Sequence, residues 1–302
     1  MACGEQGLPD AMAKKRNEMG KVIINFLSNL AYSLRAIAYV NPAERLKYKK
    51  RTLGCIYVLG NGPSLKDKLA KIEATNDSTS TFAVNDFGVS SYYAIIRPTY
   101  YMLVDPAYWN EEVNIADKEL REKLYSNMNE LTKWPMTLYV PSSVIKIIKR
   151  RNFITNPNIT IQPFNYTNFH PSQSSYFKFI LKHNFGVVPV GNILGQAIYA
   201  SIQLGYSEVQ IYGAEHSWTE DIRVNDMNEV CTIKKHFFSE DEETLIPWCK
   251  TNGEVFKMHE ILTSLRNHFY GYWFLNWYSQ EVGVKVFNCT PKSFIDAFER
   301  KK

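Results

Sequence analysis

The amino-acid sequence predicts an α/β fold, a Rossmann-like and mostly parallel sheet with helices on both faces and a lid insertion. Two observations support this prediction. Short apolar runs alternate with helical patterns after about residue 50, as in sheets covered by helices on both faces. Three successive runs also end in polar residues, namely Asn61, Asn85 with Asp86, and Asp105. Because the carboxyl ends of parallel strands form the ligand crevice of such sheets, these residues are candidates for ligand binding.

The first apolar run, Cys55–Leu59, leads into the loop Gly60-Asn61-Gly62-Pro63-Ser64 and then a helical stretch. Glycines let the backbone approach a ligand and adopt φ values that a Cβ forbids. Pro63 and Ser64 suit a helix start, whose free N–H groups attract anions. The loop lacks the spacing of the dinucleotide fingerprint and of the P-loop. It is interpreted as a phosphate-side nucleotide loop, with a plain strand-to-helix turn as the alternative.

The remaining chain continues the alternation of helices and strands. The elements expected in order are a helix over Asn114–Trp134, a strand over Met136–Val140, a basic helix over Pro141–Arg151, a strand over Ile159–Phe164, an aromatic loop over the site at Phe164–Phe185, a helix over Gly191–Leu204, a strand over Val209–Tyr212, a long helix over Val255–Glu281, a strand over Val284–Phe287 and a helix over Pro291–Arg300. Residues 215–254 are acidic and weakly patterned, which is typical of a lid or a disordered segment.

Residues 1–50 are expected to form a separate, basic and amphipathic helical segment before a catalytic domain over residues 51–302. Ten Lys or Arg residues and only two acidic residues lie between Lys14 and Arg51. Apolar residues at 23, 26, 27, 30, 34 and 37 share one helical face. Asn25, Asn29 and Arg35 interrupt it, so the stretch is a poor transmembrane span or signal peptide. It is interpreted either as a helix that contacts a membrane surface through residues 14–51 or as one packed on the domain.

Composition narrows the class of protein further. The 302 residues carry a net charge of +5, which by itself does not indicate a nucleic-acid partner. The five cysteines are irregularly spaced and form no Cys-x-x-Cys pair, which argues against a structural zinc site. Reduced thiols of this kind are typical of the cytoplasm. We therefore expect a cytoplasmic protein, placed at the inner face of the cytoplasmic membrane if the amino-terminal helix binds lipid.

Two segments resemble a known family. Gly-Asn-Gly-Pro-Ser-Leu at residues 60–65, followed by Asn85, resembles the bacterial sialyltransferases of glycosyltransferase family 42. The helix that begins near Gly191-Asn192 and the segment Leu204-Gly205-Tyr206-Ser207-Glu208 to Gly213-Ala214-Glu215 are similar to the family in the same order. The resemblance covers residues 54–110 and 186–215, with a weaker echo at residues 288–298. The family's Arg-x-Thr-Ser sequence is replaced here by Pro189-Val190-Gly191-Asn192, and the loop motif also occurs in archaeal-type pterin pyrophosphokinases.

The resemblance implies a GT-A-like glycosyltransferase that moves a CMP-activated sugar, sialic acid or a related 2-keto acid sugar, to a hydroxyl of a surface glycan or glycolipid. Tyrosine hydroxyls, with Tyr166, Tyr176 and Tyr212 as candidates, would neutralise the leaving phosphate. No Asp-x-Asp occurs, so no metal and no cofactor besides the donor is expected, and an oligomer is left open. The expected substrate-binding residues are Gly60, Asn61, Gly62, Pro63, Ser64, Asn85, Asp86, Asp105, Gly191, Asn192, Tyr212 and Glu215.

Transfer of a sugar to a hydroxyl requires a base that accepts the hydroxyl proton, and histidine suits this role. In the resembling family the base is a histidine before the last helix and strand. His268 and His259 straddle that position, and His216 follows a predicted strand end. Two other functions remain open. A magnesium-dependent pyrophosphokinase would use a carboxylate pair such as Asp86 and Asp105, and a non-catalytic nucleotide-binding protein would need no base.

Overall fold

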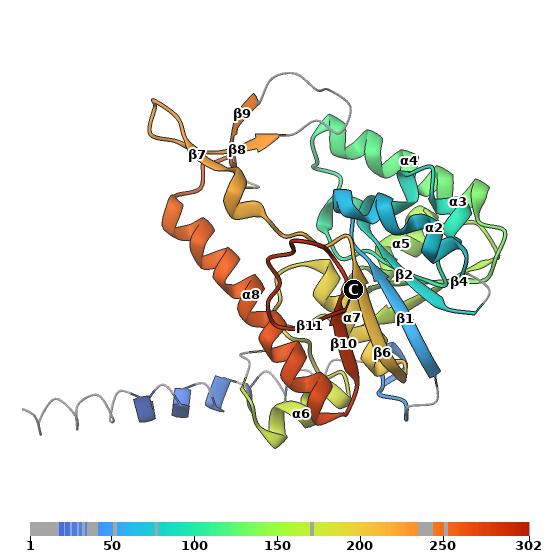
Figure 1. Cartoon of the computed structure of the whole chain (residues 1–302), viewed down its shortest axis with the longest axis horizontal. Helices are drawn as coiled ribbons and strands as arrows, with labels where there is room; N and C mark the ends of the chain where they lie inside the picture. Colours follow the sequence, from blue (N-terminus) through green and yellow to red (C-terminus); the bar gives the residue numbers. More distant parts are fainter. Residues whose placement is uncertain are drawn as a thin grey trace, which may run out of the picture.

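The computed structural model describes residues 42–50, 53–75, 78–169, 172–234, 244–250 and 253–301, with separate residues between 18 and 34 (Figure 1). Its strands are β1 Leu53–Leu59, β2 Ser80–Val84, β3 Tyr100–Met102, β4 Met136–Pro141, β5 Ile159–Phe164, β6 Tyr206–Tyr212, β7 Ile222–Val224, β8 Val230–Lys234, β9 Thr244–Pro247, β10 Lys285–Asn288 and β11 Glu299–Arg300. The α-helices are α2 Leu69–Glu73, α3 Tyr93–Ile96, α4 Ile115–Leu131, α5 Ile145–Arg151, α6 Ser175–Lys182, α7 Ile193–Gln203 and α8 Met258–Glu281. Short 3₁₀ helices are η1 Pro42–Glu44, η2 Pro63–Lys68, η3 Asn85–Val89, η4 Pro106–Tyr108, η5 Ser142–Val144 and η6 Trp218–Asp221.

The main sheet has eight strands in the order β11-β10-β6-β1-β2-β3-β4-β5. Every pairing between these strands is parallel. β1 lies between β2 and β6, so that Val58 pairs with Phe82 on one side and Ile211 on the other. The chain adds strands on one side of β1 from β2 to β5 and then returns to the other side with β6. The predicted α/β class with a parallel, Rossmann-like sheet is confirmed.

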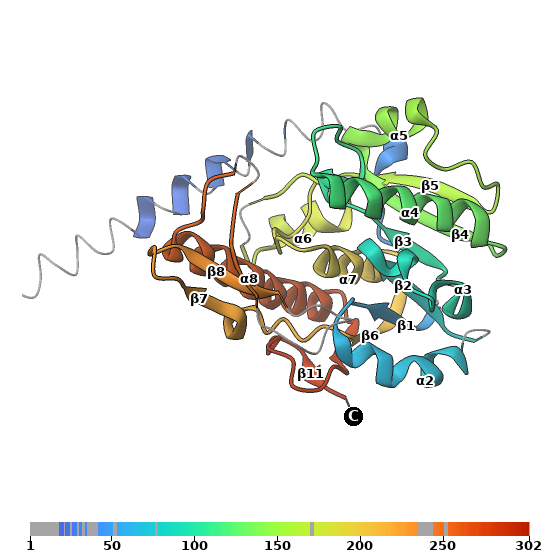
Figure 2. The ribbon, with the colours of Figure 1, turned by 90° about the horizontal axis from the view of Figure 1, so that it is seen from above.

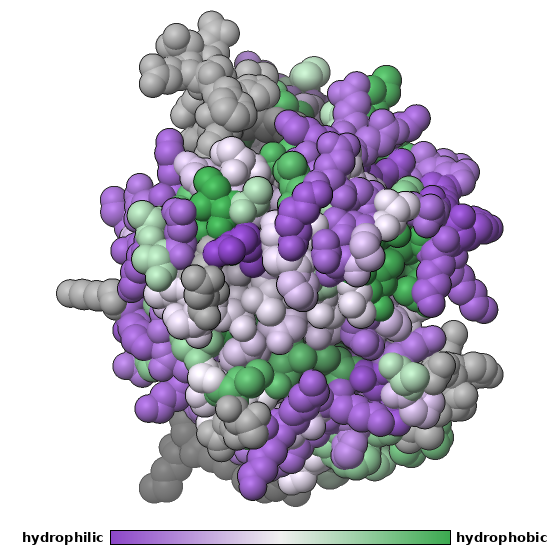
Figure 3. All heavy atoms as spheres, turned by 90° about the vertical axis from the view of Figure 1, so that its right-hand side faces the viewer, coloured by the Kyte–Doolittle hydropathy of each residue, from purple (hydrophilic) through white to green (hydrophobic). Residues whose placement is uncertain are grey.

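Helices cover both faces of this sheet (Figure 2). Side chains alternate along each strand, so Ile56 and Val58 enter one core while Tyr57 and Leu59 enter the other. The first core also holds apolar residues of α6, α7 and α8, and the second holds residues of α2, α3, α4 and α5. All eleven residues of α7 are buried, which its small and apolar sequence allows. The surface beside α3 and α4 is mainly hydrophilic, with small separate hydrophobic areas (Figure 3).

The segment expected to be a weakly patterned lid forms regular structure in its described part. β7, β8 and β9 make a three-stranded antiparallel sheet. Val230 of this sheet packs with Ile261 and Leu265 of α8 in a small separate core. The prediction of an irregular segment is therefore wrong for residues 218–234 and 244–247, because alternating side chains that point toward α8 gain burial there. Residues 235–243 and 251–252 lie outside the described part of the chain.

Two further sequence predictions differ from the structure. The aromatic segment 164–185 contains the helix α6, capped by the Ser174 hydroxyl. The helix expected over 291–300 is absent, and the segment forms turns before β11. Buried side chains hold those turns: the Asn288 amide donates to the Ile295 carbonyl at 3.0 Å, and the Ser293 hydroxyl donates to the Ala214 carbonyl at 2.6 Å. Such local side-chain bonds compete with helix formation.

The amino-terminal segment has two parts. The described residues between 18 and 34 are helical, and their large apolar side chains, including Ile23, Phe26 and Leu30, are exposed. Residues 42–50 instead pack on the domain, with Leu46 in the first core, so the packed body begins before the expected boundary at residue 51. No helix among the described residues is long and apolar enough to cross a membrane. Contact of residues 14–51 with a membrane surface stays a prediction.

Asn184 joins three segments that are distant in sequence. It is fully buried and has a left-handed φ of 47° after α6. Its Oδ1 accepts hydrogen bonds from the Leu46 amide at 2.9 Å and the Asn165 amide at 3.0 Å, and its Nδ2 donates to the Asn165 carbonyl at 3.0 Å. The side chain thereby holds residues 42–50 and the exit of β5 against α6.

We expect Asn184→Ala to lower the free energy of unfolding by at least about 3 kcal/mol. The substitution leaves three buried backbone groups without their partner, at about 1–3 kcal/mol each. Urea unfolding measures the change. Asn152→Ala is the matched control, because Asn152 has a similar φ of 52° but is exposed. Equal losses in the two variants would contradict the role given to the hydrogen bonds.

Candidate active site

The site lies where the strand order reverses, between the carboxyl ends of β1 and β6. In open α/β sheets this switch point forms the ligand crevice. The loops after the two strands are bonded to each other, since the Gly60 amide donates to the Tyr212 carbonyl at 2.8 Å and the Gly62 amide to the Gly213 carbonyl at 2.9 Å. The sequence prediction of a crevice at these strand ends is consistent with this arrangement.

The glycines of the first loop allow the two loops to approach each other. A Cβ on Gly60 would lie 2.2 Å from the Gly213 carbonyl oxygen, a contact that no side chain permits. Neither Gly60 nor Gly62 has a left-handed φ; that of Gly62 is −76°. The expectation of unusual φ values is therefore wrong, and the requirement for glycine is one of close packing between loops.

The Glu215 carboxylate binds the amino-terminal end of η2. Glu215 Oε1 accepts a hydrogen bond from the Ser64 amide at 2.9 Å. A Cβ on Gly62 would lie 1.6 Å from Glu215 Oε2, so the carboxylate rests directly on that glycine. The amide that the sequence assigned to a phosphate is thus already bound to Glu215. A phosphate would bind there only by displacing this side chain.

A pocket of about 950 Å³ opens over these loops. Its walls come from the ends of β1, β2, β3 and β6, from the start of α7 and from the middle of α8. Most of the residues expected from sequence lie in its lining, and they are Gly60, Asn61, Gly62, Pro63, Asn85, Asp105, Gly191, Asn192, Glu215, His216 and His268. Tyr166 also lines it. The structure therefore brings together residues that are up to 208 positions apart, from Gly60 to His268.

Five expected residues lie outside this lining, and the fifth of them, Tyr212, is described separately. The Asp86 carboxylate accepts a hydrogen bond from the Tyr108 hydroxyl at 2.8 Å outside the lining, and burial raises its pKa. His259 is exposed near the start of α8. Tyr176 is outside the lining, on α6. Ser64 contributes its amide to Glu215 but is not itself in the lining.

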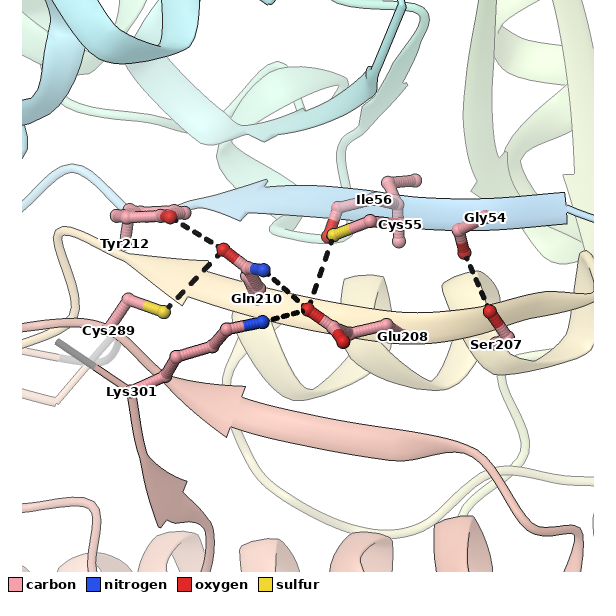
Figure 4. Close-up of polar contacts among 9 residues, drawn as sticks. All are labelled: Gly54, Cys55, Ile56, Ser207, Glu208, Gln210, Tyr212, Cys289 and Lys301. Carbon is pink, nitrogen blue, oxygen red and sulfur yellow. Dashed lines mark hydrogen bonds and ion pairs between the residues drawn. The ribbon is translucent and has the colours of Figure 1, made fainter.

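Tyr212 is not in the lining of the pocket, and its side chain belongs to a polar network on the sheet (Figure 4). Its hydroxyl donates to Gln210 Oε1 at 2.7 Å. Gln210 in turn donates to Glu208, which also binds Lys301 near the end of the chain. This network ties the carboxyl-terminal segment to β6. Because the Tyr212 hydroxyl is already hydrogen-bonded within this network, the geometry does not favour its binding of the leaving phosphate.

Asn85 presents an unpaired acceptor in the pocket. Its φ of 48° lies in the left-handed region, which asparagine tolerates better than most residues. Its Oδ1 is buried and has no hydrogen-bond partner. Next to it, Asn61 Nδ2 donates to the Val84 carbonyl at 3.2 Å. Buried acceptors without a partner are costly, so a ligand hydroxyl or amino group that reached Asn85 Oδ1 would satisfy it.

His268 also lines the pocket and carries an unpaired ring nitrogen. Its ring is hydrogen-bonded to the backbone of Gly191, and a Cβ at Gly191 would lie 2.3 Å from Nε2. Position 191 requires glycine for two reasons, namely the left-handed φ of 71° and the close contact with the His268 ring. Nε2–H therefore faces the backbone, while the buried Nδ1 has no partner. Burial lowers the pKa of His268, and the bond to Gly191 partly opposes this effect.

His216 is the second imidazole of the pocket. Burial, with a smaller effect from His268, lowers the pKa of His216 to about 3. Its ring lies 4.2 Å from the Trp218 ring, which in turn lies 5.6 Å from the His268 ring. His216 also has a left-handed φ of 54° and an unpaired buried Nδ1. Both imidazoles are therefore neutral near pH 7. Sequence reasoning missed Trp218, because one aromatic in an irregular segment gives no signal.

The described lining contains no lysine or arginine, and its acidic residues are Asp105 and Glu215. At the start of α7, Asn192 Oδ1 accepts hydrogen bonds from the Gly195 amide at 3.1 Å and the Tyr272 hydroxyl at 2.9 Å. Burial, with a smaller effect of Asp105, raises the pKa of Tyr166, which keeps this hydroxyl protonated. An anionic ligand would meet amides, hydroxyls and imidazoles there rather than fixed positive charges.

Comparison with models of known protein families finds no match, and comparison with curated protein sequences finds none either. One solved structure that is similar is the MAf glycosyltransferase from Magnetospirillum magneticum AMB-1, at 17% identity and a TM-score of 0.48. The match covers 86% of this chain and 35% of that protein, so the present chain spans about a third of its length. The fold class stated above rests on the strand order and pairing of the chain itself.

The contact between Glu215 and Gly62 predicts a specific coupling. We expect Gly62→Ala and Gly60→Ala both to lower the free energy of unfolding. Adding Glu215→Ala to Gly62→Ala should restore part of the lost free energy of unfolding. The methyl group added at position 62 then no longer collides with the Glu215 carboxylate. Adding Glu215→Ala to Gly60→Ala should restore none, because the methyl group at position 60 meets only backbone.

Urea unfolding of the two double-mutant cycles measures this coupling, which is about 0.5–3 kcal/mol for residues in contact. The Gly60 cycle is the matched control. Strict additivity in the Gly62 cycle would contradict the placement of the carboxylate on that glycine.

Proposed function

We propose that the protein is a nucleotide-sugar-dependent glycosyltransferase. In this proposal it moves sialic acid or a related 2-keto acid sugar from a CMP-linked donor to a hydroxyl of a surface glycan or glycolipid. One observation carries the proposal: a pocket at the switch point of the sheet holds a neutral imidazole, His268, whose Nδ1 is buried and unpaired. A base of this kind can accept the proton of a hydroxyl group.

The acceptor groups of the pocket favour the nucleoside end of such a donor. Glu215, Asn85 Oδ1 and Asp105 are acceptors at neighbouring strand ends. Ribose hydroxyls and the amino group of a base are the matching donors. The lack of lysine and arginine in the described lining favours a donor with a single phosphate over one with a diphosphate, because each further negative charge would face Asp105 and Glu215.

The proposed reaction assigns one task to each part of the pocket. His268 Nδ1 takes the proton of the acceptor hydroxyl as its oxygen bonds to the anomeric carbon of the donor sugar. The bond from that carbon to the phosphate oxygen breaks, and CMP leaves with the electron pair. In this proposal the Tyr166 hydroxyl and the amides near Gly191 and Asn192 bind the phosphate and the carboxylate of the sugar. Independence from metal is part of the proposal.

A pyrophosphokinase activity receives less support from this geometry. Of the two carboxylates considered for it, only Asp105 lies in the lining, whereas Asp86, although close enough for the Asp105 charge to raise its pKa, accepts a hydrogen bond from Tyr108 outside the lining. No three His, Cys, Asp or Glu side chains of the described residues converge in the manner of a metal site. The first experiment below separates the two activities directly.

We expect CMP to raise the thermal stability of the protein with or without Mg²⁺, and UDP, GDP and ATP to raise it less. A ligand at about 100 times its Kd adds roughly 2.7 kcal/mol. The measurement is a thermal-shift panel, followed by an assay of CMP release from CMP-sialic acid in the presence of neutral oligosaccharides. Stabilisation by ATP with Mg²⁺ but not by CMP would favour the pyrophosphokinase. Binding of CMP with no transfer to any acceptor would contradict the enzymatic proposal.

We expect His268→Ala to lower turnover by about 10²–10⁴ with little change in CMP affinity, since the base acts on the acceptor proton. The neutral imidazole is the active form. Because burial lowers its pKa, activity of the unaltered protein should fall only as the pH drops below the usual histidine value of about 6.5. His268→Ala should remove this acidic limb.

His259→Ala is the matched control, because His259 lies on the same helix but is exposed outside the pocket. We expect it to keep normal turnover and the same pH profile. An effect of His259→Ala equal to that of His268→Ala would contradict the assignment of the base.

A further inference from the structure

Basic and aromatic side chains gather on one surface beside α6. They come from the chain before β1 and from the end of α6, and the Tyr48 amide joins the two segments by donating to the Lys182 carbonyl at 3.1 Å. Phe179 is 48% exposed, and Lys47 and His183 are exposed as well. We call this set of residues the α6 surface, and it consists of Arg45, Lys47, Tyr48, Phe179, Lys182 and His183.

The rings of the α6 surface lie close to one another and to a cation. The centre of the His183 ring lies 4.5 Å from that of Phe179 and 5.9 Å from that of the half-buried Phe185. The Arg45 guanidinium lies 4.8 Å from the centre of the Phe185 ring. Apolar rings with basic side chains beside them are typical of surfaces that rest on the boundary between lipid headgroups and acyl chains.

The α6 surface carries positive charge that no neighbouring carboxylate neutralises. Partial burial lowers the pKa of His183, and the nearby charges of Arg45, Lys182 and Lys47 lower it further, so this ring is neutral near pH 7. None of these three cations forms an ion pair with a carboxylate of the described residues, whereas the other lysine of α6 binds a carboxylate of α8 at 2.7 Å. The surface therefore presents three positive charges to an anionic partner.

An exposed apolar helix lies against the same side of α6. The described amino-terminal residues are helical, and the centre of the Phe26 ring lies 6.5 Å from that of Tyr176. Tyr176 is three residues before Phe179 on α6, so the two are neighbours on the surface of that helix. Ile23 and Leu27 share the helical face of Phe26, and all three are exposed. A partner that removed this face from water would gain its hydrophobic free energy.

The combination of an apolar helix face with basic residues favours a lipid surface over other partners. Ten basic and two acidic residues lie between Lys14 and Arg51, an excess that attracts anionic headgroups. A nucleic acid would use the rings and cations of the α6 surface, but it has no acyl region to receive Ile23 and Leu27. A second copy of the chain would bury the apolar face only by bringing two basic surfaces together, which like-charge repulsion disfavours.

We propose that the α6 surface and the helical residues between 18 and 34 bind one anionic lipid membrane together. The apolar helix face and Phe179 enter the boundary between headgroups and acyl chains, while Arg45, Lys47 and Lys182 meet lipid phosphates. Because α6 joins the two contacts, the folded domain adds a second, tethered contact to that of the helix. No residue of the α6 surface lines the pocket, so lipid binding uses no group of the candidate active site.

The test is co-sedimentation of the full chain with vesicles made of equal parts of phosphatidylcholine and phosphatidylglycerol. Vesicles of phosphatidylcholine alone serve for comparison. We expect the chain to bind the mixed vesicles and to bind much less to phosphatidylcholine alone. Binding should also weaken between about 0.1 M and about 1 M salt, because the Debye length falls from about 10 Å to about 3 Å.

Single substitutions test each contact in turn. Lys47→Gln and Lys182→Gln should each weaken binding to the mixed vesicles about fivefold, as expected when one basic residue near an anionic surface is neutralised. Phe179→Ala on the α6 surface and Ile23→Gln on the amino-terminal helix should each weaken it about tenfold, because one apolar side chain is no longer buried in the lipid.

Lys149→Gln and Leu131→Ala are the matched controls. Lys149 is exposed on α5 and Leu131 is 41% exposed on α4, and both helices pack on the other face of the sheet from α6. We expect both control variants to bind the mixed vesicles as the unaltered chain does. An unchanged midpoint of thermal unfolding shows that each variant is folded.

Four results would overturn the proposal. The first is no binding to the mixed vesicles, and the second is an equal effect of the α6 surface variants and the controls. The third is a dimer in sedimentation velocity without lipid that Ile23→Gln dissociates, which would make a second copy the partner. The fourth is binding of a single-stranded oligonucleotide in preference to the vesicles. Because the vesicle assay contains neither donor nor acceptor, its result is independent of the CMP experiment.

Discussion

The close contact between the loops after β1 and β6 determines the arrangement of the whole site. β1 is paired on both sides, and the chain leaves it toward β2 before returning to its other edge as β6. Two loops that leave neighbouring parallel strands for opposite faces of a sheet open a crevice between them. Here the first residues of the loops stay together, because Gly60 lacks the Cβ that would collide with the Gly213 carbonyl. The crevice therefore opens beyond this contact, over Asn61 and Glu215.

The Glu215 side chain changes what the glycine loop can recognise. A strand, a glycine-rich turn and a helix start normally provide amides for a phosphate. In this protein the Ser64 amide already binds a carboxylate, so the loop presents oxygen acceptors instead of N–H donors at that point. A loop sequence that normally binds an anion through N–H donors therefore presents acceptors for hydrogen-bond donors in this protein. Glu215 and Gly62 lie 153 positions apart, and the local sequence around the loop contains no information about that contact.

The sequence was informative where local pattern and burial agree. The apolar runs that became β1, β2 and β3, and the polar residues at their ends, follow from rules of strand burial alone, as does the small-residue helix α7. The failures have a common cause in tertiary hydrogen bonds. Asn184 fixes the end of α6 within a segment that shows no clean period, and Asn288 holds the turns of residues 291–298 in place of a helix. The hydrogen-bond partners of these asparagine side chains are set by the tertiary structure, so the residues next to them in the sequence do not reveal them.

The choice between His259 and His268 shows what a sequence can settle about a site. At about 100° per residue, nine residues on one helix amount to two and a half turns, so the two side chains lie on opposite faces. Only one of them can therefore face a given pocket, but which one depends on how α8 packs. The structure settles this point through Gly191, whose backbone binds the His268 ring.

The environment of His268 also keeps the imidazole ready to accept a proton. Trp218 and Tyr272 pack against His216, and Trp218 packs against His268 as well. Removal of water by these rings lowers the pKa of both imidazoles, and the nearby His268 lowers the pKa of His216 further. Asp105 and Glu215 lie in the same lining, but Glu215 is bound to Ser64 and Asp105 accepts from the Ala107 amide at 2.9 Å. Each of these hydrogen bonds occupies one carboxylate oxygen, so the second oxygen of each side chain remains available to a ligand beside the neutral imidazoles.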